Sequence, residues 1–292
     1  MGKTAVTPEA GQWIAEQLAP YWQPGPARLR RGTVESTVPH LFEAYARIFH
    51  RVLLWREGTL SELRWRDVTE QQGTRWHPRM QWASVAGSLA GAVYRGGYWD
   101  AADPRPGILD PTQRSLLARV LTAHTGTPQD AYFALWEGYG WLHSGASVTV
   151  VYTGDGEGTG EDREALAARE ALNRPAFAAG QLDAPRLDIA DGCRAYHLFR
   201  GPVADYAGDT WGSVQPAARE QSANLAWPAD RRWCLATEID FDSTLIGGSA
   251  ALVDAVVAHP GLEAARVTPG TSLQWNADTV NPGPGTGLQQ WS

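Results

Sequence analysis

The sequence predicts an α+β fold, with a mainly helical N-terminal half packed on a smaller mixed or antiparallel sheet in the C-terminal half. Three observations predict it. Apolar residues recur at helical spacing before residue 143, helix-start signals precede several of these segments, and β-branched runs typical of strands follow after residue 144. The apolar fraction of 43% is ordinary for a folded globular chain and too high for a disordered one.

The N-terminal half contains the segments predicted as helices. Proline follows a capping residue at Asp110-Pro111 and at Thr127-Pro128, which is the usual start of a helix. Leu41, Tyr45 and Ile48 fall at helical spacing and predict the buried face of another helix. The predicted helices cover 8–18, 40–53, 61–71, 77–91, 111–125 and 128–142.

The C-terminal half combines strands with fewer helices. Strands are predicted at 147–153, at 193–201 and, as one or two strands, within 231–246. A Gly-rich acidic loop leads into a helix at 163–173, and Ser249 caps another that runs to Pro260. The predicted regions are 1–143, 144–281 and a flexible tail at 282–292, with one continuous domain as the alternative.

Composition excludes several classes of function. The net charge of −7 gives no basic surface for nucleic acid, so no nucleic-acid partner is predicted. No window reaches the roughly 18 consecutive apolar residues of a membrane span. Two cysteines cannot form a disulfide framework, which favours a cytoplasmic location. Zinc and P-loop motifs are both missing, so no cofactor is predicted.

One short motif has a chemical counterpart. Residues 239–245 read as an apolar strand ending in DxDxT, which resembles the first motif of the haloacid-dehalogenase phosphohydrolases. The resemblance implies that Asp240 is the nucleophile and Asp242 the general acid/base, with Mg²⁺ between them. Only 48 residues follow Thr244, with no lysine and a single arginine, so the rest of such a catalytic core does not fit.

The same stretch suggests a second geometry. In an extended strand, alternate side chains share a face, which would align Glu238, Asp240 and Asp242. Three aligned carboxylates either are solvated or bind a hard cation such as Mg²⁺ or Ca²⁺. These residues are therefore the metal candidates, and together with Glu137 and His143 they are the catalytic candidates.

Fourteen tryptophans are unusual for a chain of this length, and two clusters of them are candidate binding sites. Each cluster also has an ordinary structural interpretation, as helix-end packing or as a stacked surface turn. The first cluster places aromatic rings beside Glu137 and His143 as a possible pocket wall. The second joins indoles to an arginine that can hold an anion. The predicted binding residues are Trp136, Tyr139, Trp141, Trp227, Arg231 and Trp233.

Three segments, 42–50, 124–140 and 224–249, together resemble a family of tryptophan-rich soluble proteins from high-GC bacteria. No activity is known for that family. The resemblance implies one cytosolic unit over roughly residues 40–280, and it supplies no catalytic residues.

Two hypotheses of function follow. The first is a soluble cytosolic binding or interaction protein with an aromatic-rich recognition surface, in an immunity-like or regulatory role. Its partner is an unidentified protein or small molecule, and the acidic charge would attract basic partners. The alternative is a carboxylate-dependent hydrolase or transferase, with or without a divalent metal. Whether the protein is an enzyme stays open at this point.

Overall fold

The computed structural model describes residues 3–56, 59–86, 94–95, 98–99, 104–143, 176–177, 179–208, 211 and 221–281. The strand predicted at 147–153, the acidic loop, the helix at 163–173 and the tail at 282–292 lie outside the described residues.

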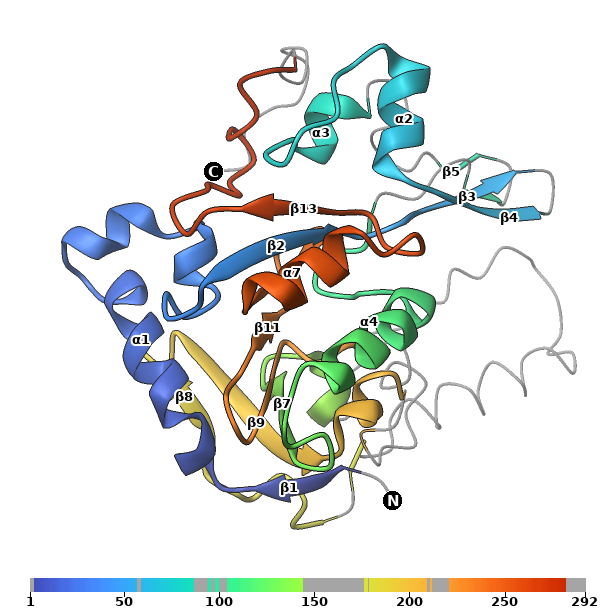
Figure 1. Cartoon of the computed structure of the whole chain (residues 1–292). Coiled ribbons are helices and arrows are strands. Elements are labelled where there is room, and N and C mark those ends of the chain that lie inside the picture. Colours follow the sequence, from blue (N-terminus) through green and yellow to red (C-terminus); the bar gives the residue numbers. More distant parts are fainter. Residues whose placement is uncertain are drawn as a thin grey trace, which may run out of the picture.

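A nine-stranded antiparallel sheet is the framework of the fold (Figure 1). Every neighbouring pair of its strands runs antiparallel. Its order is β1 (Thr4–Val6), β9 (Arg194–Gly201), β7 (Ala131–Trp136), β10 (Leu225–Pro228), β11 (Cys234–Ala236), β12 (Ser243–Gly248), β2 (Ala44–Phe49) and β13 (Ala264–Val267), and β8 (Leu187–Ile189) also pairs with β9. Strands before and after residue 144 therefore share one sheet.

The prediction of a mainly helical N-terminal half is wrong. The segment 40–53 contains β2 and the start of β3 (Val52–Arg56), and 128–142 contains β7. All six residues of β2 are buried, so this strand shows no polar alternation. A strand buried on both faces reads as a continuous apolar run, and such a run also matches helical spacing.

Two of the helices predicted from capping signals are confirmed, but the one predicted from Thr127-Pro128 is wrong, because the strand β7 follows there. The helix α4 (Pro111–Ala123) begins where Asp110 accepts a hydrogen bond from the Gln113 N–H, at 2.9 Å. The helix α7 (Ala250–Val257) begins where Ser249 accepts one from the Leu252 N–H, at 3.2 Å. The strand predicted at 193–201 is confirmed as β9, and two strands, β11 and β12, lie within 231–246.

The sheet has a hydrophobic core on each face. On one face, α4 and α7 pack over strand residues such as Phe133 and Ile246. On the other, α1 (Gln12–Trp22) packs over residues such as Leu225 and Leu245. Helices therefore cover both faces of one sheet, which differs from the predicted packing of a helical half against a small sheet.

The remaining elements lie around this sheet. The predicted helix at 8–18 is a 3-10 turn, η1 (Pro8–Gly11), followed by α1, and the one at 61–71 is β4 (Thr59–Leu63) followed by α2 (Trp65–Gln72). Of the helix predicted at 77–91, the described part contains the single turn α3 (Trp82–Val85). The other elements are η2 (Pro26–Arg30), η3 (Val34–Ser36), β5 (Tyr94–Arg95), β6 (Tyr98–Trp99), η5 (Gly140–His143) and η6 (Val203–Tyr206).

Among the described residues, every helix is too short or too polar to cross a bilayer.

Candidate functional site

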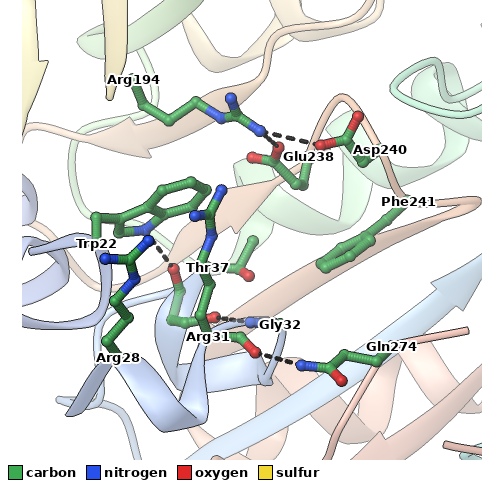
Figure 2. Close-up of a pocket in the computed structure, with 11 residues that line it drawn as sticks. Trp22, Arg28, Arg31, Gly32, Thr37, Arg194, Glu238, Asp240, Phe241 and Gln274 are labelled. Atoms are coloured by element: carbon green, nitrogen blue, oxygen red, sulfur yellow. Dashed lines mark hydrogen bonds and ion pairs between the residues drawn. The ribbon is translucent and has the colours of Figure 1, made fainter. Parts of the chain in front are cut away.

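A pocket of about 360 Å³ lies between the segment that follows α1 and the turn that joins β11 to β12 (Figure 2). We call it the arginine pocket. Its lining residues are Trp22, Arg28, Arg31, Gly32, Ser36, Thr37, Arg194, Glu238, Asp240, Phe241 and Gln274. Residues from near both ends of the sequence therefore form its walls.

The N-terminal wall is held by hydrogen bonds around Ser36. Trp22 ends α1, and its indole N–H donates to the Ser36 carbonyl oxygen at 3.1 Å. The Ser36 hydroxyl oxygen accepts a hydrogen bond from the Gly32 N–H at 3.0 Å. The Arg31 guanidinium lies 4.2 Å from the Trp22 ring centroid, within the range of a cation–π interaction. The loop that carries Arg28 and Arg31 is thus folded against α1.

Arg194 holds the residues of the opposite wall together. It begins β9, and its Nη2 donates to the Glu238 carboxylate at 2.8 Å and to the Asp240 carboxylate at 3.0 Å. The same guanidinium lies 4.8 Å from the Trp22 ring and 5.8 Å from the Trp136 ring. Glu238 is 9% exposed, and this burial raises the pKa of its carboxyl group although Arg194 opposes the rise. Both carboxylates of the pocket are therefore already held by one cation.

The predicted alignment of three carboxylates on one strand face is wrong. Residues 237–242 connect β11 to β12 and are not part of either strand. Glu238 and Asp240 meet at Arg194, whereas Asp242 accepts a hydrogen bond from Arg47 Nη2 at 3.1 Å. The part of the chain that the structure describes contains no group of three His, Cys, Asp or Glu side chains placed to hold a metal ion.

The predicted aromatic segment, which contains Trp136, Tyr139 and Trp141, begins at the end of β7 and lies near Arg194. The Trp136 N–H donates to the Asn224 side-chain oxygen at 2.8 Å, and the Asn224 amide donates to the Tyr139 hydroxyl at 2.8 Å. Gln221 also donates to that hydroxyl, at 2.9 Å. Burial raises the pKa of Tyr139 to about 12. This network fixes Trp136 and Tyr139, and it brings the aromatic segment next to the Glu238 turn.

The other members of that segment face elsewhere. Glu137 forms an ion pair with Arg186 at 2.5 Å, on the surface. Trp141 stacks between the rings of Tyr139 and Phe177. His143 ends η5, and its side chain lies outside the described part of the structure. Glu137 and Trp141 thus do not line the arginine pocket.

The second predicted cluster is divided between the two cores. Trp227 is 1% exposed and packs near Trp13, and Trp233 is completely buried on the opposite face of the sheet. Arg231 has φ of 55° and lies 5.4 Å from the Trp13 ring. Both indoles of this cluster are core residues, and neither can contact a partner at the surface.

Sequence reasoning did not identify the cations of the pocket. Trp22, Arg28, Arg31, Arg194 and Gln274 line it but are not among the predicted site residues. The available signal was the run of arginines at 28–31 in a Pro-rich loop of an acidic chain. The lining of the pocket combines three guanidinium groups with two carboxylates, so positive charge is in excess there. Within the described residues, Arg28 and Arg31 form no ion pair with a carboxylate.

Comparisons with known proteins identify no relative: no family model, no curated protein and no solved structure matches the chain. The function is therefore argued from the geometry of the pocket.

Proposed function

We propose that the protein is a binding protein that holds a small anionic molecule in the arginine pocket. The observation that carries the proposal is the placement of Arg28 and Arg31 at the pocket without carboxylate partners among the described residues. The two acidic groups nearby are already paired with Arg194. The excess positive charge is therefore available to a ligand.

The chemistry of the lining favours a carboxylate or phosphate group. A guanidinium presents a planar fork of N–H donors that matches the oxygens of either anion. The Trp22 ring lies beneath the Arg31 guanidinium and restricts it, so less conformational entropy is lost when a ligand binds. The chain as a whole carries a charge of −7, so this cationic pocket differs in sign from the average surface.

A carboxylate-dependent hydrolase or transferase is the second candidate. The observation that favours it is Glu238, a buried carboxylate with a raised pKa at the wall of the pocket. Groups of this kind act as general acids and bases in many enzymes. Under this alternative Glu238→Gln abolishes turnover of a bound substrate, whereas under the binding proposal the variant still binds the anion.

Substitution of the free arginines tests the binding proposal. We expect Arg31→Gln and Arg28→Gln each to weaken the binding of inorganic phosphate or malonate about tenfold, because a hydrogen bond to a charged group contributes roughly 1.5–3 kcal/mol. Isothermal titration calorimetry at low salt measures the dissociation constants.

Arg119→Gln is the matched control, since Arg119 is exposed on α4 and does not line the pocket. Equal loss of affinity in all three variants would indicate a general effect of charge. Failure of the unmodified protein to bind either anion would refute the proposal.

A further inference from the structure

A second pocket, of about 450 Å³, adjoins the arginine pocket. We call it the tryptophan pocket. Its lining residues are Gln81, Trp82, Ala83, Asp240, Phe241, Asp242, Leu273, Gln274 and Trp275. Asp240, Phe241 and Gln274 line both pockets, so the two pockets are adjacent.

The two pockets differ in chemistry. The arginine pocket presents guanidinium groups, whereas the tryptophan pocket presents the rings of Trp82, Phe241 and Trp275. Two acidic side chains also line the tryptophan pocket. Asp240, which lines both pockets, is paired with Arg194, and Asp242 is paired with Arg47. The carboxylates at its edge each have an arginine partner, and the rest of its lining is mainly apolar.

Trp275 is the exposed aromatic residue of this lining. Its side chain is 73% exposed, whereas Trp65, Trp211, Trp227 and Trp233 are fully buried. Covering an indole removes a large apolar area from water, and each buried Å² contributes roughly 25 cal/mol. An apolar group in this pocket would gain that contribution.

The wall between the pockets is fixed by contacts across the sequence. The Gln274 side-chain amide donates to the Arg31 carbonyl oxygen at 2.8 Å, and Thr33 pairs with Ser272 in an isolated antiparallel bridge. The loop that carries Arg31 and the segment that carries Trp275 are thereby held side by side.

We propose that the ligand is an amphiphilic anion, with its charged head at Arg28 and Arg31 and its apolar tail across Phe241 against Trp275. This inference rests on the proposed function and adds the class of ligand to it. The residues shared by the two adjacent pockets and the separation of charge from apolar surface carry the argument.

A homologous series of carboxylates tests it. Butyrate, hexanoate and octanoate share one head and differ in tail length, and each methylene that becomes buried strengthens binding about fourfold. We expect the dissociation constant to fall along the series. NMR titration of the indole N–H signals measures it at low millimolar ligand and identifies Trp275 by its loss in Trp275→Phe.

Two variants test the contacts of the ligand's apolar tail separately from those of its charged head. Trp275→Ala removes an exposed ring, and Ala83→Glu places a carboxylate at an exposed position of the tryptophan pocket. We expect both to weaken octanoate at least about tenfold, the loss of roughly two buried methylenes, and to leave butyrate nearly unchanged. Leu41→Ala is the control, because Leu41 is an exposed apolar residue outside both pockets.

Each outcome decides between the two proposals. Binding of butyrate and phosphate without any gain from a longer tail would overturn the amphiphile and leave the anion site standing. An equal effect of Trp275→Ala on short and long carboxylates would do the same. Absence of binding for every anion, phosphate included, would refute the anion site and the amphiphile together.

Discussion

Arg194 shows how much of the site depends on one side chain. Its guanidinium binds Glu238 and Asp240 from the β11–β12 turn and lies against Trp22 from α1 and Trp136 from β7. Removal of one partner from a buried ion pair leaves an uncompensated charge, which is strongly destabilising. Arg194 therefore both positions the acidic wall and keeps its carboxylates away from an incoming anion.

Another residue, His50, is expected to make stability depend on pH. It is fully buried, its Nδ1 lies 2.8 Å from the Arg105 carbonyl oxygen, and its Nε2 lies 2.9 Å from the Thr244 hydroxyl. Burial lowers the pKa of His50 from 6.5 to about 4. The unfolded chain therefore takes up a proton below pH 6.5, which the folded chain accepts only near pH 4.

The resulting prediction concerns the free energy of unfolding. The contribution of His50 is complete above pH 6.5 and is lost at about 1.4 kcal/mol per pH unit as the pH falls toward 4. Urea unfolding at several pH values measures it for the unmodified protein and for His50→Gln. We expect a flatter profile for the variant, and parallel profiles would contradict the assignment.

The site could be predicted from the sequence only in part, for reasons that are visible at single residues. Glu238 and Asp240 stand two positions apart in the sequence, so a local pattern identified them. Their partner Arg194 is far away in the chain and is brought to them by the sheet, whereas Arg31 is placed by the loop that folds against α1. The prediction of Trp227 and Trp233 as binding residues fails because composition alone does not separate a buried indole from an exposed one.

At the scale of elements, capping signals predict two helices correctly and fail at Thr127-Pro128, where β7 follows. The starts of α4 and α7 were predicted correctly because Asp110 and Ser249 each satisfy a free backbone N–H, which is a local interaction. The segment of β2 is predicted as a helix because a central strand buried on both faces loses its alternation, and the segment of β7 because Thr127-Pro128 matches a helix start. Their strand state depends on partners such as β12 and β9, which lie far away in the sequence.

Ser249 provides a test at this scale. Ser249→Ala removes the acceptor for the Leu252 N–H at the start of α7, and we expect unfolding to become easier by about 1 kcal/mol. Ser249→Asp is the comparison, because aspartate is an equally good cap and its charge is favourable at a helix N-terminus. Chemical denaturation measures both variants, and equal losses would show that the cap contributes little.

For the whole molecule, the order of strands predicts the distribution of stability. Amides of the central strands β7, β10 and β11 are paired on both sides, whereas β1 and β13 lie at the two ends of the sheet. We expect hydrogen exchange to be slowest in the three central strands and fastest in the two end strands. Exchange measured by NMR or mass spectrometry checks this, and protection of β1 equal to that of β11 would contradict it.

The arrangement of the arginine pocket also has a consequence during protein synthesis. Trp22 and Arg31 leave the ribosome early, but Arg194, Glu238 and Gln274 follow much later. A nascent chain that ends before Gln274 lacks one wall of the pocket, however well its earlier segments have folded. Under the proposed function, recognition of the anion would therefore begin only after residue 274 has been synthesised.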